Sequence, residues 1–227
     1  YYLILWFITI YVQLLLPPLE FIHIAEKANL IIPLGNKLLR SACIFINKLE
    51  AKGINTKIAV NISGIQLLDE EFSENVIKIL DETNINPEKL ELEITESILL
   101  NNFDLINERL KELRSNGIDI ALDDFGKGYS SFFRLDELNV NSLKIDKSFI
   151  DKITIRSEDR LITSELIGMA HKFNLKVVAE GVESKDELDY LKENNCDIIQ
   201  GYLFSKPLTE SKIITLLRSF EASKDFR

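Results

Sequence analysis

Short apolar runs alternate with amphipathic stretches along most of the chain. The runs are six or seven residues long and rich in β-branched residues, which is typical of strands buried on both faces of a parallel sheet. The stretches 70–83, 103–116, 160–173 and 184–195 place apolar residues on one face, which predicts helices. This alternation predicts a parallel sheet with helical crossovers. The expected strands are residues 57–63, 90–95, 118–123, 140–145, 175–180 and 197–203.

The uncharged run at the start of the chain, residues 1–16, adds to this pattern. It is at the short limit of the roughly 20 apolar residues that a membrane-spanning helix needs, and Pro17-Pro18 ends it. We therefore favour a buried strand over a membrane span. With one or two strands from this run, the chain predicts an α/β fold, a TIM-like (β/α) barrel that is incomplete at its amino-terminal end. An open doubly wound sheet is the alternative, although no glycine-rich phosphate loop follows an expected strand.

The charge balance limits the class of partner. The 227 residues include 27 basic and 36 acidic side chains, which gives a net charge of −9. This argues against binding along a DNA or RNA polymer, which requires a basic face. The two cysteines, Cys43 and Cys196, show no CxxC or CxxH spacing. We expect free thiols in a reducing cytoplasm.

Polar side chains stand at or near the end of each expected strand. In a barrel of parallel strands these ends converge on one face, where barrel active sites lie. Ionised groups inside apolar runs are costly unless they are paired or bound to a metal. We therefore expect these side chains to form one site. The residues are Asn61, Glu93, Asp123, Asp124, Lys144, Glu180 and Gln200.

The types of these side chains indicate metal-dependent chemistry on an anionic substrate. Carboxylate and amide oxygens suit Mg²⁺ or Mn²⁺ better than zinc. Two such cations could activate a water for in-line attack on phosphorus, with Lys144 supplying positive charge near the phosphate or the water. Enolase-type proton abstraction uses the same residue types, so the side chains alone leave both reactions open.

Six segments, in order, resemble motifs of the EAL domain family. The likeness covers about residues 17–210, and residues 18–26 resemble the family's segment before its second helix. Any one of these motifs alone would be weak, whereas six in order are specific. The segments are NIS at 61–63, ELEITES at 91–97, DDFGKGYSS at 123–131, LKID at 143–146, VAEGVE at 178–183 and QGYLF at 200–204 followed by KPL at 206–208.

The resemblance implies a phosphodiesterase that hydrolyses cyclic di-GMP to the linear dinucleotide pGpG with two Mg²⁺ or Mn²⁺ ions. It also implies a division of the chain into an apolar segment at 1–16, an EAL domain at 17–222 and a tail at 223–227. In this family the metals are held by side chains at motif positions. The matching residues here are Asn61, Glu93, Asp123 and Asp124.

The same resemblance implies roles for the remaining motif residues. Lys144 would position the hydrolytic water, and Glu180 would support the metal ligands. Glu96 would anchor the loop after Asp124, which borders the second metal site and a homodimer interface. Contacts to water, phosphate or guanine on the substrate side would come from Gln200, Phe204 and Pro207.

One motif of the family is missing. The Glu-Ala-Leu that names the family, followed by Arg-Trp, contributes a metal ligand and a nucleotide contact. The corresponding residues here read YYLILWF, and no acidic residue precedes Glu20. We therefore expect a weakened first metal site, and two hypotheses follow: a phosphodiesterase, or a non-catalytic receptor for cyclic di-GMP. For the whole protein we expect a bacterial, cytoplasmic location with sensory, cyclase or membrane domains upstream.

Overall fold

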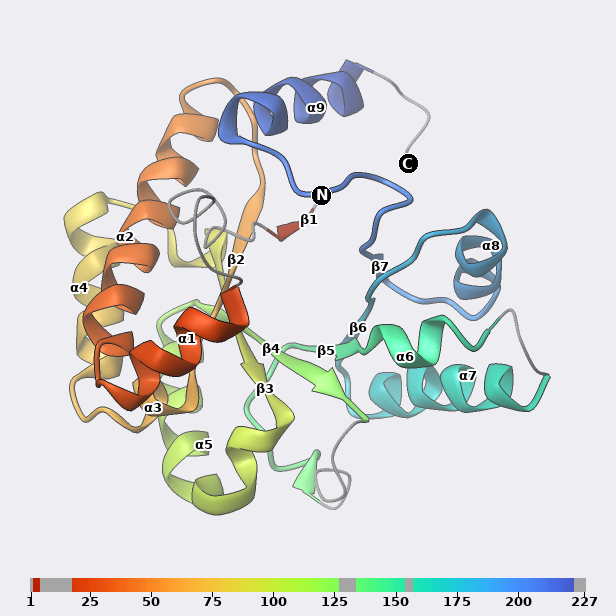
Figure 1. Ribbon diagram of the computed structural model, residues 1–227, viewed down its shortest axis with the longest axis horizontal. Coiled ribbons are helices and arrows are strands. Elements are labelled where there is room, and N and C mark those ends of the chain that lie inside the picture. Colours follow the sequence, from red (N-terminus) through yellow and green to blue (C-terminus); the bar gives the residue numbers. More distant parts are fainter. Residues whose placement is uncertain (1, 5–17, 127–133, 154–156, 223–227) are drawn as a thin grey trace.

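One parallel sheet forms the centre of the molecule. The computed structural model describes residues 2–4, 18–126, 134–153 and 157–222. In these residues seven strands pair in chain order, and the sheet curls so that the helices lie on its outer side (Figure 1). The strands are β1 (Tyr2–Ile4), β2 (Lys57–Asn61), β3 (Leu90–Thr95), β4 (Asp119–Phe125), β5 (Ser142–Ile145), β6 (Lys176–Ala179) and β7 (Ile198–Ile199).

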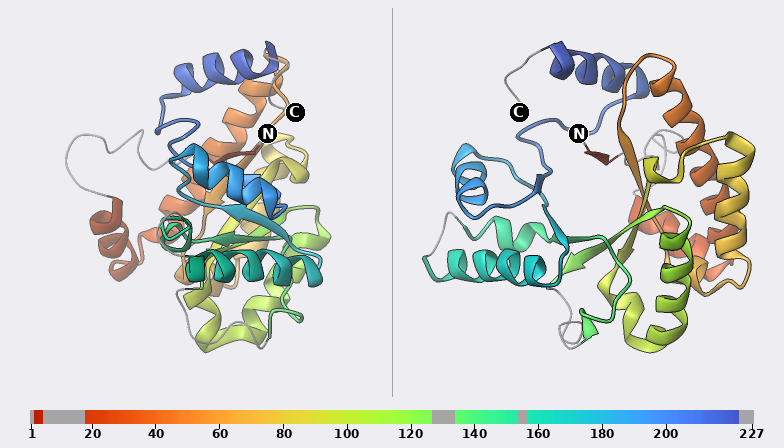
Figure 2. Two further views of the ribbon diagram at one scale, coloured as in Figure 1. Left: turned by 90° about the vertical axis from the view of Figure 1, so that its right-hand side faces the viewer. Right: turned by 180° about the vertical axis from the view of Figure 1, so that it is seen from behind.

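Helices lie in the described segments between the strands, except between β4 and β5, and they cover the sheet, as Figure 2 shows from two further sides. Two single turns of 3-10 helix, η2 (Pro87–Lys89) and η3 (Glu96–Ile98), flank β3. The helices are α1 (Pro18–Lys27), α2 (Ile31–Glu50), α3 (Gly64–Leu68), α4 (Phe72–Thr83), α5 (Leu99–Ser115), α6 (Lys147–Ile150), α7 (Ser157–Lys172), α8 (Lys185–Glu193) and α9 (Glu210–Ala222).

The strand order decides between the two expected folds. Successive strands are neighbours from β1 to β7, as in a (β/α) barrel, whereas a doubly wound sheet reverses direction at a switch point. Within the described ranges no pairing joins β7 to β1, so the sheet is a curled, open part of a barrel. The expected α/β fold, an incomplete TIM-like barrel, is therefore confirmed.

The start of the chain supplies a strand, as expected. β1 runs parallel to β2, with Tyr2 opposite Lys57 and Ile4 opposite Ala59. Residues 5–17 lie outside the described residues. Among the described helices, none combines the length and the apolar character needed to cross a membrane.

The bounds of most expected elements shift by a few residues, and two elements differ most from the observed ones. α5 begins at Leu99 rather than 103, and its helical backbone is interrupted at Asn102, whose φ is −142°. The strand expected at 197–203 is limited to Ile198–Ile199, because the chain turns at Gly201. Beyond that point Leu203 N donates to Val182 O at 3.0 Å, so the apolar residues after Gln200 close a loop instead of extending the ladder.

The apolar core lies between the curled sheet and its helices. Leu39 and Phe45 of α2 and Leu110 of α5 are buried there against strand residues such as Leu92 and Ile120. Both cysteines are free thiols, as the sequence predicts, with Cys43 buried and Cys196 partly buried. This packing fixes the strands, and the strands in turn fix the side chains at their ends.

Candidate functional site

The register of the strands brings polar side chains to one edge of the sheet. Asn61, the last residue of β2, lies opposite Glu93 of β3. Thr95 of β3 lies opposite Asp123 of β4, two residues beyond Glu93. These positions share the carboxyl-terminal end of the sheet with Lys144 of β5 and with Glu180, whose backbone N–H donates to Ile145 O at 3.1 Å.

A buried lysine joins three carboxylates at this edge. Lys144 Nζ lies 2.6 Å from Glu180 Oε1, 2.8 Å from Glu93 Oε1 and 3.3 Å from Asp123 Oδ1. The side chains of Lys144 and Glu93 are only 2% and 1% exposed. Four consecutive positions in the sheet, β3 to β5 and the end of β6, thus contribute to one ionic cluster, which we call the Lys144 cluster (Glu93, Asp123, Lys144 and Glu180).

Burial and charge shift the pKa values within the Lys144 cluster. Burial raises the pKa of Glu93 and of Glu180, and the repulsion from Asp123 adds to this, while Lys144 opposes it. Burial alone would lower the pKa of Lys144, but attraction by the three carboxylates outweighs burial and raises it. Lys144 therefore stays protonated, and one positive charge faces three acidic groups.

This excess of acidic groups fits a divalent cation. Glu93 Oε2 is buried and accepts no hydrogen bond from the described residues. Carboxylate oxygens are ligands that Mg²⁺ and Mn²⁺ prefer. As the side chains lie, however, the carboxylates converge on the Lys144 ammonium, and among the described residues no three acidic, His or Cys side chains are placed to hold one ion. The donor set suits a cation, whereas the ligand assignment stays a prediction.

The end of β4 makes a tight turn that carries two carboxylates. Asp124 has a φ of +58°, in the left-handed region, and its N–H donates to Asp123 Oδ1 at 2.9 Å. The pairing of β4 with β5 shifts register between Leu122 and Phe125. Glu96 is buried, and its Oε2 accepts a hydrogen bond from Gly126 N at 3.1 Å. Residues 127–133, on which the dimer prediction depends, lie outside the described residues.

The residues predicted to contact the substrate are less closely joined to the cluster. Gln200 O accepts from Val182 N at 3.0 Å, which places Gln200 beside the segment that follows Glu180. Gln200 Oε1 is buried and finds no hydrogen-bond donor among the described residues. Phe204 is half-buried and Pro207 is exposed. Their contacts to a nucleotide remain a prediction, as does that of Asn61 to a metal.

Two capping boxes beside the site were not predicted from the sequence, although their pattern can be recognised there. Ser184 accepts from Glu187 N, and Glu187 Oε2 accepts from Ser184 N at 3.0 Å and from Glu183 N at 2.8 Å. Ser63 and Gln66 make the equivalent pair at the start of α3, just after Asn61. The signal is Ser followed three residues later by Glu or Gln. These caps fix the loops that leave β2 and β6.

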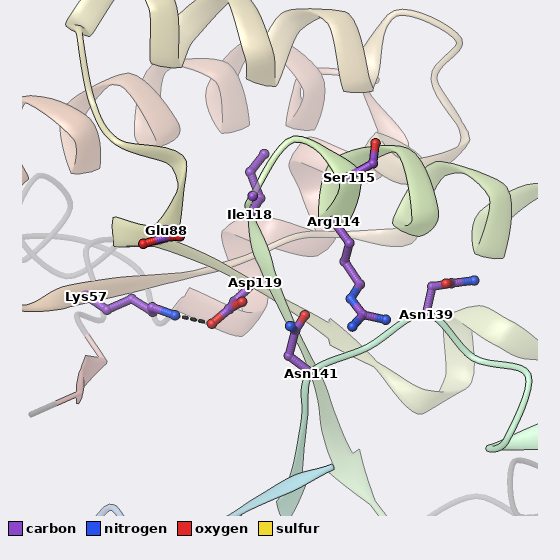
Figure 3. A pocket seen from close by; sticks show the side chains of 9 residues that line it. Lys57, Glu88, Arg114, Ser115, Ile118, Asp119, Asn139 and Asn141 are labelled. Carbon is purple, nitrogen blue, oxygen red and sulfur yellow. Dashed lines mark hydrogen bonds and ion pairs between the residues drawn. The ribbon is translucent and has the colours of Figure 1, made fainter. Parts of the chain in front are cut away.

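A polar pocket of about 510 Å³ lies at the other end of the strands (Figure 3). Its walls include the ion pair between Lys57 and Asp119, the first residues of β2 and β4. Arg114 of α5 and Asn141, the residue before β5, extend into the same region. None of the predicted site residues lines this pocket, and the amino-terminal face of a barrel usually serves stability.

The comparisons with known proteins agree with the motifs. The EAL domain model matches residues 11–207. The chain is 39% identical to the cyclic di-GMP phosphodiesterase NbdA of Pseudomonas aeruginosa over 92% of its own length and 27% of that protein. It is 36% identical to the cyclic di-GMP phosphodiesterase PdeR of Escherichia coli, over 86% of the chain and 29% of the relative. The chain thus spans about a quarter of the length of these curated relatives.

Solved structures give the same likeness. A complex of the PaMucR phosphodiesterase with c-di-GMP superposes with a TM-score of 0.84 and 33% identity, over 89% of this chain and 83% of that one. The FimX EAL domain from Pseudomonas aeruginosa bound to c-di-GMP superposes with a TM-score of 0.77 and 26% identity, over 85% of this chain and 77% of the other.

Proposed function

Because the chain belongs to the EAL domain family, we propose that it binds cyclic di-GMP at the carboxyl-terminal edge of its sheet and hydrolyses it to pGpG. The observation that carries this proposal is the Lys144 cluster, in which buried carboxylates from neighbouring strands converge. We extend the proposal to two Mg²⁺ or Mn²⁺ ions, a homodimer formed through the loop after Asp124, and a cytoplasmic location in a bacterium.

The residues of the site divide the work of hydrolysis. Asn61, Glu93, Asp123 and Asp124 would hold the cations, which supply Lewis-acid activation of water and phosphate when bound. Lys144 would orient the attacking water through its ammonium N–H groups and offset charge on the phosphate. Glu180, which is not one of the proposed metal ligands, lies 2.6 Å from the Lys144 ammonium and would hold it in place.

The residues at the rim would select and place the nucleotide. Gln200 offers a side-chain oxygen and amide group beside the segment after Glu180, where a water or a phosphate could be bound. Phe204 and Pro207 would border the guanine base. Glu96 would hold the turn that carries Asp124 through its bond to Gly126 N.

A second candidate function is a receptor that binds cyclic di-GMP without turnover. The observation that favours it is the composition of the strand beside β2. β1 lies beside β2, next to the strand that ends at Asn61, and its residues Tyr2, Leu3 and Ile4 offer no carboxylate. A two-metal site that lacks one carboxylate ligand loses affinity for that metal and stabilises the transition state less.

One experiment separates the two functions. The purified chain is incubated with cyclic di-GMP and Mn²⁺, pGpG is measured by chromatography, and binding is measured by calorimetry. Turnover that is lost in Glu93→Gln supports the phosphodiesterase, because the amide keeps the shape but removes the charge. Binding without turnover supports the receptor. If neither binding nor turnover is found in a folded protein, both proposals fail.

A further inference from the structure

The turn at the end of β4 needs support from outside the strand. A left-handed φ such as the +58° of Asp124 costs Asp less than most residues with a side chain, but it is still a sparsely populated conformation that contacts with the surroundings stabilise. The shift in register between Leu122 and Phe125 leaves this turn outside the regular ladder with β5. The positions of the Asp123 and Asp124 carboxylates therefore depend on the contacts made by the turn.

Contacts that support the turn include two hydrogen bonds and one aromatic ring. Asp124 N donates to Asp123 Oδ1 at 2.9 Å, and Gly126 N donates to Glu96 Oε2 at 3.1 Å. On the other side, the ring of Phe149 lies directly against Gly126. A Cβ atom at Gly126 would be 2.6 Å from Cε2 and 2.7 Å from Cζ of that ring, so any larger residue there would have to displace the ring.

Phe149 also connects the turn to the strand that bears Lys144. It belongs to α6, which begins directly after β5, and Asp146 caps this helix by accepting from Ser148 N at 2.9 Å. Phe149 N donates to Asp146 O at 3.0 Å, and its side chain packs on the apolar core. The helix and the apolar core therefore hold Phe149 in place, and its ring limits how far Gly126 can move toward α6.

We propose that Phe149 is a positioning residue for the two carboxylates at the end of β4. Its ring confines Gly126, and the confined turn keeps Asp124 in its left-handed conformation and Asp123 facing Lys144. The metal-binding part of this inference rests on the proposed function. Phe149→Ala removes the ring and leaves room in which Gly126 can move, so the turn relaxes and the carboxylates lose their common geometry.

Two measurements on the full chain test this. Mn²⁺ binding is measured by calorimetry, because changes in residues that orient metal ligands typically weaken metal binding by about 10–100-fold. Amide hydrogen exchange is measured without metal on peptides that cover residues 119–126. We expect Phe149→Ala to bind Mn²⁺ about 10-fold or more weakly and to exchange faster in these peptides, and Phe149→Leu to recover much of both properties.

Tyr190→Ala is the matched control. Tyr190 is a partly buried aromatic residue that packs on the core from α8. It controls for a general loss of stability, which we monitor by thermal melting in all variants. Unchanged Mn²⁺ binding and unchanged exchange at residues 119–126 in folded Phe149→Ala would overturn the inference, as would an equal change in Tyr190→Ala.

The exchange measurement also separates this inference from the proposed function. If the unsubstituted chain binds neither Mn²⁺ nor cyclic di-GMP, the proposed function fails. Faster exchange in Phe149→Ala, but not in Tyr190→Ala, would still support the positioning of the turn by the ring. Exchange that is the same in all three proteins refutes the positioning whether or not the metal binds.

Discussion

Replacing Lys144 with Met tests whether its ammonium holds the cluster together. Met fills most of the space of the lysine stem but removes a charge that three carboxylates approach to between 2.6 and 3.3 Å. Removing one partner of a buried ion pair costs about 3–5 kcal/mol, because the other charge stays buried. A carboxylate can avoid this by binding a proton. Burial already raises the pKa of Glu93 and of Glu180 to about 7, so near pH 7.5 protonation of either group costs only about 1 kcal/mol. The second route costs less, so we expect a loss of roughly 1–3 kcal/mol.

The loss is measured by thermal melting in EDTA. At this chain length about 1 kcal/mol corresponds to roughly 2–4 °C, so we expect Lys144→Met to melt roughly 5 °C lower near pH 7.5. Without the ammonium, the folded-state pKa values of the carboxyl groups lie further above their unfolded values. The free energy of unfolding therefore falls as the pH rises from about 4.3 toward neutrality, and the deficit of the variant is smaller near pH 5.

Adding Mn²⁺ supplies a replacement charge. We expect Mn²⁺ to raise the melting temperature of Lys144→Met by more than that of the unsubstituted chain, since ligand binding to the folded state stabilises it. Lys111→Met, at an exposed position on α5, is the control and should melt within about 2 °C of the unsubstituted chain. If folded Lys144→Met has the same melting temperature as the control in EDTA, the ammonium does not hold the Lys144 cluster together.

Three further predictions concern the surroundings of the site. In Gly201→Ala the new Cβ would lie 2.1 Å from Val182 O and 2.3 Å from Val182 N, so we expect the free energy of unfolding in denaturant to fall by roughly 3 kcal/mol or more. Gly168→Ala is the control, because this position on α7 has open space, and it should gain about 0.5–1 kcal/mol. Equal effects of the two substitutions would contradict the close approach of Gly201 to Val182. Ser184→Ala removes the cap of α8 and should cost about 1 kcal/mol, which lowers the melting temperature by roughly 2–4 °C. Ser219→Ala on α9 is the control and should leave the melting temperature almost unchanged. Equal melting temperatures of the two variants would argue against the cap. Burial raises the pKa of Cys196 to about 11. In Cys43→Ser, where Cys196 is the remaining cysteine, its reaction with a disulfide reagent near pH 8 should be roughly 100-fold slower in the folded protein than in urea. Equal rates in the folded protein and in urea would contradict the raised pKa.

The period of the apolar runs was enough to predict the sheet. β-branched runs marked β2 to β6 because strands buried on both faces have little tolerance for polar residues. The same rule overestimated the length of β7. Leu203 is apolar for a different reason, because it closes a loop on Val182 that depends on the close approach of Gly201 to Val182. Sequence patterns report burial and do not distinguish a ladder from a packed loop.

The candidate site was predicted in part. That Glu93, Asp123, Lys144 and Glu180 would meet followed from their places at strand ends. That one ammonium would contact three carboxylates did not follow, because it depends on the reach of the lysine side chain and on the register across β3 to β6. The role of Phe149 could not be read either, since Phe149 and Gly126 lie on opposite sides of β5 in the sequence and meet only in the folded chain.

The sequential order of the strands has a consequence for biosynthesis. β3 and β4, with Glu93 and Asp123, leave the ribosome before β5 with Lys144, and Glu180 follows later still. An early intermediate would thus have to bury two acids with no counter-ion, which is costly. Nascent chains that end before Lys144 should therefore keep the edge of β4 open to water, and the emergence of β5 would be the step that lets this half of the domain consolidate.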